Sequence, residues 1–416
     1  MTYLERFDAT PEANRFALVH GWLETEALPF INELRAKRPI LRTSVCTFVA
    51  DFNDVVEVLR VHQVFTNKPY HEKMKPYLMS EDDTPMHNRD KSAMSAFLDR
   101  ADIPRIRAFV ADETNAALDR ANGLIEVISG ITRHVPIRLV ESYFGLSDAP
   151  PGKFAEWSYW NQYDAFHNHP WDIVPDRASV AANVHRCQQE MTDYLTMLLV
   201  KRQAAVLALL PLEDDVVTRI IRTHIQTPGQ YGLLWKGLNI GGLLIGAVDT
   251  TSQAASQALA QLMKRPQALA SAAASAQSDD PTEFDGYVWE ALRFDPITPF
   301  LFRISSAPYT LGAGRPWQTV IPAGTSVLPL VLAAMHDPVR FPHPDAFDPT
   351  RTPTVNTFHF GHGLHECMGR YVGGVMVPEI VRQILLRYDL KVVEPLSFQG
   401  KPLPERFVIS WDPSRG

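Results

Sequence analysis

Residues 358–371 read Phe358-His-Phe-Gly-His-Gly-Leu-His-Glu-Cys-Met-Gly-Arg-Tyr371. Glycines alternate with histidines ahead of a single cysteine, Cys367, and a helical pattern follows from Gly369 to Leu386. Gly361 and Gly363 let the loop fold tightly and direct N–H donors at the sulfur. A thiolate placed just before a helix is also stabilised by the helix N-terminus. The stretch therefore predicts a tight loop that presents an ionised thiol.

Two kinds of metal site are compatible with this loop. One is a zinc cluster built from His359, His362, His365 and Cys367, since imidazole and thiolate are good zinc ligands. Against zinc, glycines separate the histidines and no second cysteine pair completes a structural site. The other is a haem held by the thiolate, which donates electron density to iron and favours O–O cleavage. Phe360 would shield the sulfur and Gly369 would let the helix approach a flat macrocycle, so haem is favoured.

The segment from Phe360 to Gly369 resembles the haem-binding signature of the cytochrome P450 family without a break. The resemblance implies haem b (iron protoporphyrin IX) as cofactor, with Cys367 as its axial thiolate and metal ligand. It implies further cofactor contacts from Phe360, Gly361, His365 and Gly369. It also implies the P450 fold, mainly α with a small β part, as one large domain over residues 1–416 that encloses the haem.

A second segment that resembles the family is Glu290-Ala-Leu-Arg293. Residues three apart on a helix lie on one face, so the carboxylate and the guanidinium can pair. Most such pairs are solvated surface bridges of little value, but the family's Glu-x-x-Arg pair is buried. The resemblance adds a second arginine, Arg351 in Phe347-Asp-Pro-Thr-Arg351, and implies a structural role for all three.

The most apolar window, Leu233 to Val248, is rich in glycine and is interrupted by Lys236 and Asn239. It is shorter than the roughly 20 apolar residues of a membrane span, which favours a buried helix. Its last part, Gly246-Ala-Val-Asp-Thr-Thr251, resembles the oxygen-binding segment of the family's central helix.

Within that segment the Thr250 hydroxyl can bond back to the Gly246 carbonyl and open the helix slightly. The resemblance implies that Gly246 leaves room for dioxygen, and that Thr250 and Asp249 are catalytic residues that relay protons. The alternative is a helix-packing glycine beside an ordinary threonine.

Cations for the haem propionates are also implied by the resemblance. Arg303 lies ten residues after Arg293, at the family's offset, and His87 in Thr84-Pro-Met-His-Asn-Arg-Asp-Lys91 matches the histidine of the family's third helix. The sequence departs from the family at Lys91, where arginine is usual. Lysine binds a carboxylate as a point charge without bidentate geometry, so Arg89 competes with it for this role.

The composition excludes several classes of protein. Of 416 residues, 45% are apolar, which suffices for a large core and excludes wholesale disorder. The net charge of −7 excludes a global basic field for nucleic acid or an anionic membrane. Three cysteines build no disulfide framework, and the N-terminus shows no signal peptide, so a cytoplasmic protein is expected. We expect Cys46 and Cys187 to pack as small apolar residues.

Helical spacing dominates the first 280 residues, and strand patterns are sparse. We expect short strands at residues 45–49, 309–311 and 319–321, with a turn at 322–324 followed by another strand. A helix led by Pro266 is expected up to residue 278. Five prolines between residues 338 and 353 predict an ordered but non-repetitive segment.

The resemblance implies a haem monooxygenase of the soluble bacterial type. It would insert one atom of O2 into a hydrophobic small molecule, with Thr250 and Asp249 delivering protons. No flavin or iron–sulfur module is attached, so electrons are expected from a ferredoxin and its NAD(P)H-dependent reductase. Two interpretations of the basic residues are open, a docking face for the ferredoxin or scattered charges that keep the chain soluble; the residues are Arg89, Lys91, Arg105, Arg107 and Arg370.

Two alternative functions remain open. A peroxide-driven peroxygenase on the same fold is the first, although the Asp249-Thr250 pair favours the use of O2. A non-catalytic haem-thiolate sensor is the second, although an oxygen-activating helix would serve no purpose there. Neither a DNA-binding patch nor an output domain is visible in the sequence.

An apolar substrate pocket is expected from two segments of the family pattern. Its residues are Gly242 and Ile245 in the central helix, and Thr298, Phe300 and Leu301 after the Glu-x-x-Arg helix. We expect Gly242 to enlarge the cavity. An aromatic cluster falls where the family's mobile lid helices lie, and packing is favoured over substrate contact for its members, Trp157, Tyr159, Trp160, Tyr163, Phe166 and Trp171.

Overall fold

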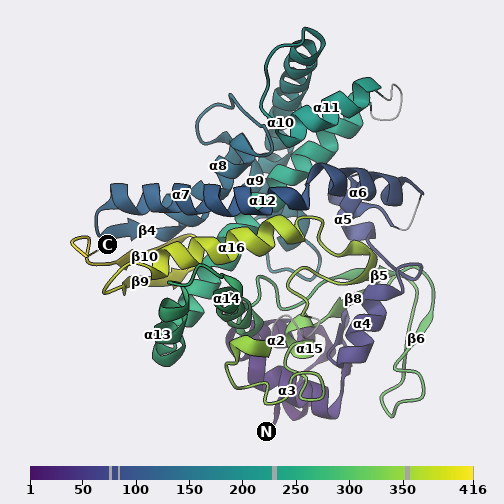
Figure 1. The fold of residues 1–416 in the computed structure, drawn as a ribbon. Helices are drawn as coiled ribbons and strands as arrows, with labels where there is room; N and C mark the ends of the chain where they lie inside the picture. The colour runs from purple at the N-terminus through teal and green to yellow at the C-terminus, as the bar shows by residue number, and fades with distance from the viewer. Residues whose placement is uncertain (75–76, 83–84, 227–231, 352–356, 416) are drawn as a thin grey trace. The chain divides into compact units, whose positions relative to one another are not determined.

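The computed structural model describes residues 1–74, 77–82, 85–226, 232–351 and 357–415 (Figure 1). Its contacts divide the chain into two units. Unit 1 comprises residues 1–75, 79–87 and 289–367, and unit 2 comprises residues 76–78, 88–288 and 368–416. Two of the boundaries between the units fall within helices, namely α6 (Pro85–Phe97) and α14 (Thr282–Phe294).

Unit 1 combines short helices with two antiparallel or mixed β-sheets. Its helices are α1 (Tyr3–Ala9), α2 (Glu12–Thr25), α3 (Ala27–Lys37), α4 (Phe52–Arg60), α5 (Lys68–Met74) and α15 (Val331–Ala334). Its larger sheet has the order β1 (Ile40–Arg42), β2 (Thr47–Val49), β8 (Ser326–Pro329), β5 (Arg303–Ser305), β3 (Phe65–Thr66). The smaller one pairs β6 (Tyr309–Leu311) with β7 (Thr319–Ile321). Among the described strands, only β2 and β8 run parallel.

Helix α4 shows why these sequences fold as they do. The Asp51 carboxylate accepts hydrogen bonds from the N–H groups of Asn53 (2.9 Å) and Asp54 (3.2 Å), which caps the helix. Val55, Val58 and Leu59 recur at helical spacing, and all three are fully buried in the core against β3, β8 and the 358–367 loop.

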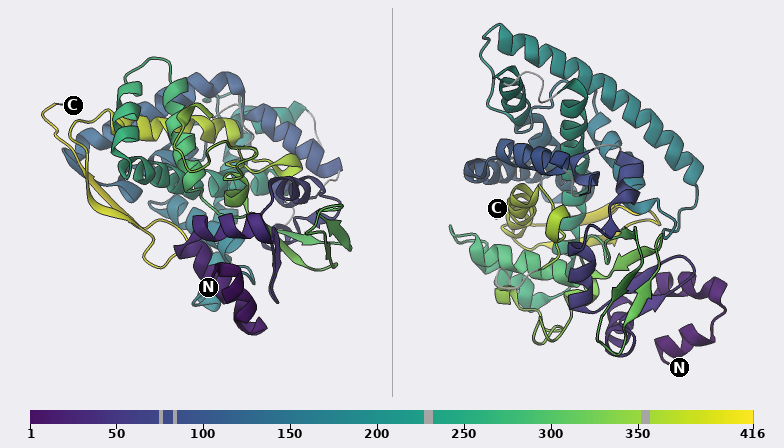
Figure 2. Two further views of the ribbon diagram at one scale, coloured as in Figure 1. Left: turned by 90° about the horizontal axis from the view of Figure 1, so that it is seen from below. Right: turned by 90° about the vertical axis from the view of Figure 1, so that its right-hand side faces the viewer.

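Unit 2 is mostly helical. Its helices are α7 (Ile103–Ala121), α8 (His134–Ser142), α9 (Lys153–His167), α10 (Arg177–Leu207), α11 (Val216–Gln226), α12 (Leu233–Met263), α13 (Pro266–Ser275) and α16 (Arg370–Leu385). A three-stranded antiparallel sheet has the order β4 (Leu124–Glu126), β10 (Arg406–Ser410), β9 (Lys391–Ser397). Figures 1 and 2 show α7 lying along α16, and α10 as one long continuous helix.

Helix α12 forms the centre of unit 2. It contacts α8, α9, α10 and α16, and a π-helical turn at Ile128–Thr132 packs beside it. Most of its residues are buried, which explains why its sequence is apolar on nearly every side. It is therefore the buried helix that the glycine-rich window predicted.

The secondary structure confirms most of the sequence-based expectations. The predicted strands are β2, β6, β7 and β8, and Pro266 occupies the first turn of α13. Residues 338–351 contain no regular helix or strand except a 3-10 turn at Pro349–Arg351, while residues 352 and 353 lie outside the described residues. The expected fold class, mainly α with a small β part, is confirmed; one domain over residues 1–416 stays a prediction.

Candidate functional site

The cysteine loop of unit 1 is a tight turn ending at an exposed thiol. Gly361 and Gly363 adopt φ angles of 73° and 74°, a left-handed conformation that glycine adopts without strain. A Cβ at Gly363 would lie 2.9 Å from the Leu59 carbonyl oxygen, so this position also requires glycine for space. The Cys367 N–H donates to the Phe360 carbonyl (2.8 Å), and Cys367 itself is exposed.

The same loop is supported by aromatic and aliphatic packing. The Phe360 ring lies 5.3 Å from the Trp289 ring, centroid to centroid, and Leu301 borders Gly361. The predicted helix after the loop begins at Arg370, with Gly369 as its N-cap. Trp289 was not singled out from the sequence, because a lone tryptophan one residue before the Glu-x-x-Arg pair carries no motif of its own.

Unit 1 also contains a group of buried side-chain nitrogens, one of them from the cysteine loop itself. Arg303 is 4% exposed; one terminal nitrogen donates to the Phe302 carbonyl (2.7 Å), and its Nε has no partner among the described residues. The imidazoles of His87 and His365 meet edge to face at 5.2 Å. Burial lowers the pKa of His365 to about 4, although the nearby Asp82 carboxylate acts to raise it. His365 is therefore neutral at physiological pH.

The propionate candidates at positions 89 and 91 lie on α6. His87 and Lys91 are four residues apart and so share a face of the helix. The Arg89 Nε donates to the Asp90 carboxylate at 2.6 Å, which draws that guanidinium toward a neighbouring side chain. The choice between Lys91 and Arg89 stays a prediction.

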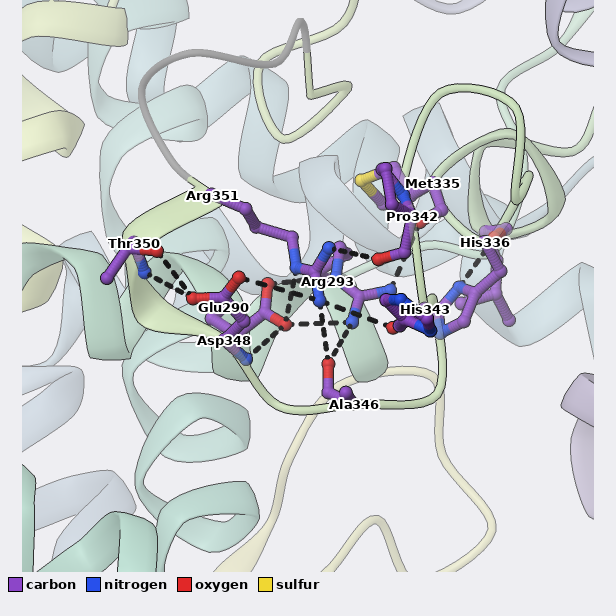
Figure 3. A network of polar contacts seen from close by, with 11 residues as sticks. Glu290, Arg293, Met335, His336, Pro342, His343, Ala346, Asp348, Thr350 and Arg351 are labelled. Atoms are coloured by element: carbon purple, nitrogen blue, oxygen red, sulfur yellow. Dashed lines mark hydrogen bonds and ion pairs between the residues drawn. The ribbon is translucent and has the colours of Figure 1, made fainter.

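The Glu290–Arg293–Arg351 cluster is a closed network of buried charges (Figure 3). Arg293 donates through two nitrogens to the Glu290 carboxylate at 2.8 Å each, in the bidentate geometry that strengthens such pairs. Arg351 Nε reaches the same carboxylate at 3.2 Å. Backbone carbonyls take the remaining donors, namely those of Met335, Pro342, His343 and Ala346. The predicted partner, Arg351, is confirmed.

Helix α12 carries a local opening at Gly246. The Thr250 hydroxyl donates to the Gly246 carbonyl, as the spacing predicted. Gly246 is exposed although its neighbours in the helix are mostly buried, and a Cβ added there would meet nothing within 4 Å. The helix therefore presents an open backbone position beside the Thr250 hydroxyl.

Asp249 points away from solvent, into the interior of unit 2. It is 1% exposed, and its carboxylate accepts hydrogen bonds from Arg133 Nε (2.9 Å) and from the Ser158 hydroxyl (2.6 Å). Burial raises the pKa of Asp249, while Arg133 and Ser158 act to lower it. Sequence reasoning missed both partners, which lie 116 and 91 residues away in segments without a motif.

The expectation that Gly242 enlarges an apolar cavity is wrong. A Cβ at Gly242 would lie 2.2 Å from the Tyr77 ring, so the missing side chain makes room for that ring. Ile245, three residues on, is 6% exposed. In unit 1, the Thr298 hydroxyl donates to the Phe300 carbonyl (2.6 Å), and Leu301 packs against the core.

The aromatic cluster of α9 is partly a packing feature. Trp157 is 2% exposed, lies 5.3 Å from the Tyr194 ring and donates its indole N–H to Glu190 (3.0 Å). Trp171 is 1% exposed and stacks on His169 at 4.7 Å. The preferred interpretation as packing is confirmed for these two tryptophans.

The chain is similar in sequence to proteins of known family. Residues 284–413, which include the Glu-x-x-Arg pair and the cysteine loop, match the family model described as Cytochrome P450. The chain is 27% identical over 315 residues to cytochrome P450 monooxygenase PikC of Streptomyces venezuelae, covering 74% of this chain and 68% of PikC. It is 24% identical over 377 residues to erythromycin C-12 hydroxylase of Saccharopolyspora erythraea, covering 89% of each.

This chain belongs to the cytochrome P450 family. The P450 heme domain from Tepidiphilus thermophilus shares its fold, with a TM-score of 0.78 at 17% identity over 95% of this chain and 96% of that one. The chain is a P450 monooxygenase, an oxidoreductase, and its cofactor is haem b ligated by a cysteine.

The residues present fit that cofactor. Cys367 is the one exposed cysteine among the described residues. The buried guanidinium of Arg303 makes no ion pair among those residues, although the Asp82 carboxylate is near enough to raise its pKa, and a haem propionate would bind its unpartnered Nε. In unit 2, the open space over Gly246 keeps the backbone of this P450 accessible.

Two of the basic residues considered for docking a redox partner, Arg105 and Arg107, differ in their surroundings. Arg107 pairs with Glu379 and Asp285, each at 2.8 Å, so its charge is already balanced inside unit 2, and its docking role stays a prediction. Arg105 is about half exposed. Arg105 and Arg107 differ in this way because residues two positions apart on a helix lie on nearly opposite faces.

The other two cysteines of this P450 are buried. Burial raises the pKa of Cys46 to about 12 and that of Cys187 to about 11, so both stay protonated thiols. Their predicted role as small apolar residues is confirmed. Separately, no helix in the described ranges is both long and apolar enough to cross a bilayer.

Proposed function

We propose that this P450 inserts one atom of O2 into a hydrophobic small molecule, with Cys367 as the thiolate ligand of its haem. The main observation in support of this proposal is the exposed cysteine at the end of a glycine loop that leads into α16. Relatives named as hydroxylases, such as erythromycin C-12 hydroxylase and 6-deoxyerythronolide B hydroxylase, support hydroxylation as the reaction type.

The chain's own residues would hold the cofactor by charge and shape. Haem, when bound, supplies the oxygen-activating chemistry. Arg303 would bind one propionate with its unpartnered Nε, and neutral His365 and buried His87 would offer ring nitrogens to the same groups. Phe360 and Trp289 would keep water from the Cys367 sulfur.

Protons would be delivered by α12. The Thr250 hydroxyl lies beside the open position at Gly246, and its bond to the Gly246 carbonyl orients the oxygen. Asp249, the next residue, is a buried acid whose raised pKa brings it toward the range useful for proton transfer. Arg133 and Ser158 would hold its carboxylate in one orientation.

Electrons would come from a ferredoxin and its NAD(P)H-dependent reductase. Docking through charge would make reduction slower as salt rises. Arg105 is the better residue to test, since Arg107 is tied to two carboxylates. Neutralising Arg105 should lower the rate of reduction at low salt more than at high salt.

The experiment that tests the function measures product, NAD(P)H and peroxide together in a reconstituted system with a ferredoxin and its reductase. Thr250→Ala should keep NAD(P)H consumption but form less product and release more peroxide, because the proton-positioning hydroxyl is gone. Thr251→Ala, on the adjacent position, is the matched control. Unchanged coupling in Thr250→Ala would defeat the assigned role, and product formed only with added peroxide would indicate a peroxygenase.

A further inference from the structure

Lys236 is a buried cation near the start of α12. Its side chain is 2% exposed, and its backbone N–H bonds to the Gly232 carbonyl in the first turn (3.1 Å). In the part of the chain that the structure describes, the ammonium group makes no ion pair and no hydrogen bond. An isolated charge removed from water is costly, and burial accordingly lowers the pKa of Lys236.

Two polar side-chain atoms near Lys236 also lack a hydrogen-bond partner among the described residues. Asn239, one turn further on, is 1% exposed; its amide nitrogen donates to the Trp235 carbonyl (2.9 Å), but its Oδ1 has no partner among the described residues. His224 of α11 is close enough to Lys236 for the ammonium to lower its pKa, and its Nδ1 is likewise unpartnered there. Buried polar groups are normally hydrogen-bonded, so this cluster fits a missing polar ligand.

The position of Lys236 along α12 relates this cluster to Thr250. Spacings of three and four residues place one set of positions on a single face, namely 236, 239, 243, 246 and 250. Ten residues separate Lys236 from Gly246, which corresponds to about 15 Å along the helix. The Cα–Cβ bond tilts toward the helix N-terminus, so the ammonium extends beyond that distance.

We infer that the substrate of this P450 is a hydrophobic carboxylic acid whose carboxylate pairs with Lys236. The inference rests on the proposed function, which places the oxidised carbon near Gly246 and Thr250. One ammonium group balances a single negative charge, which suits a carboxylate better than a phosphate dianion. The carboxylate would also accept the His224 N–H, and the positive N-terminal end of α12 favours the same charge. The site of oxidation then lies roughly 15 Å or more from the carboxylate.

The test titrates the haem-loaded full chain with two acids and their methyl esters, following the low-to-high-spin shift. The pairs are tetradecanoic acid with methyl tetradecanoate, and abietic acid with methyl abietate. At least one acid should bind about tenfold more tightly than its ester, because only the acid forms a charge-assisted bond. Lys236→Met should bring that ratio close to one.

Lys264→Met is the matched control, since Lys264 is exposed at the other end of α12. It removes the same charge and should leave the acid preference intact. Lys236→Met should also raise the unfolding temperature of the ligand-free protein, because a buried unpaired charge disappears. A lysine needed for folding would lower it.

Three results would overturn the inference: no spin shift with either acid, equal affinity for acid and ester, or an acid preference that survives in Lys236→Met. The reduced carbon monoxide spectrum is recorded on every sample. A missing thiolate band in the unmodified protein would count against the proposed function itself. An intact band without acid preference counts against the carboxylate alone.

Discussion

Two buried arginines of unit 1 differ in how completely their charge is balanced. Arg293 is 0% exposed and shares a bidentate pair with Glu290, with carbonyl oxygens accepting its other donors. Arg303 is 4% exposed and has one hydrogen bond to a carbonyl and an unpartnered Nε among the described residues. One network is complete within the protein, whereas the other contains no ion pair among the described residues.

We propose that this difference separates residues that hold the fold from residues that bind a ligand. A satisfied buried network fixes a single arrangement, and removing one partner leaves a charge that nothing balances. An unsatisfied buried cation costs stability in the ligand-free protein, and a bound anion would remove that cost. Arg303, with its unpartnered Nε, and Lys236, which is 2% exposed and makes no ion pair among the described residues, both fall in this second group.

The largest effect should come from breaking the complete network. Glu290→Gln removes the carboxylate that both Arg293 and Arg351 bind, and should lower the free energy of unfolding by about 3–5 kcal/mol. Chemical denaturation measures this change. Glu283→Gln, on an exposed position of the same helix, should change it little. Similar small losses in both variants would show that the cluster is not structural.

Arg303→Met should behave in the opposite way. Removing an unbalanced buried charge should leave the ligand-free protein as stable or more so, while haem is lost roughly tenfold faster because a propionate loses its charged partner. Transfer of haem to excess apomyoglobin measures the loss. Arg315→Met, at an exposed position, is the control. Unfolding of the ligand-free Arg303→Met protein, or unchanged haem retention, would remove the distinction between the two arginines.

A smaller effect is expected at Asp249. Its hydrogen-bond network in unit 2 is complete, and yet we propose that Asp249 is catalytic. Arg133→Gln removes the cation that lowers the pKa of the Asp249 carboxyl, so that pKa rises further above its ordinary value. Because Asp249 must be protonated to deliver a proton, the alkaline limb of the pH profile for product per NAD(P)H should then move to higher pH, by about one to two units. Arg138→Gln, on the partly exposed side of α8, should leave the profile in place. An unshifted profile in Arg133→Gln would restrict Arg133 to a structural role.

The sequence predicted those parts of the molecule that depend on short local patterns. The glycine loop before Cys367, the Thr250 bond to Gly246 and the Glu290–Arg293 pair each follow from residues within a few positions of one another. Arg351 was predicted only through the family resemblance. These motifs identify most residues of the candidate site from the sequence alone.

What the sequence did not predict depends on contacts between distant segments. Arg133 and Ser158 reach Asp249 from other helices, and the Tyr77 ring fills the space over Gly242. Lys236 appeared in the sequence only as an interruption of an apolar window. Its burial without a partner depends on how α12 packs, which no local pattern encodes.

The central claim is that Cys367 is the haem ligand, and the carbon monoxide spectrum of the reduced protein tests it most directly. The unmodified protein should show the strongly red-shifted Soret band of a thiolate-ligated haem. Cys367→Ser should lose that band, while Cys46→Ser and Cys187→Ser should keep it, because both of these thiols are buried and protonated. Retention of the band in Cys367→Ser, or its loss in Cys187→Ser, would contradict the assignment.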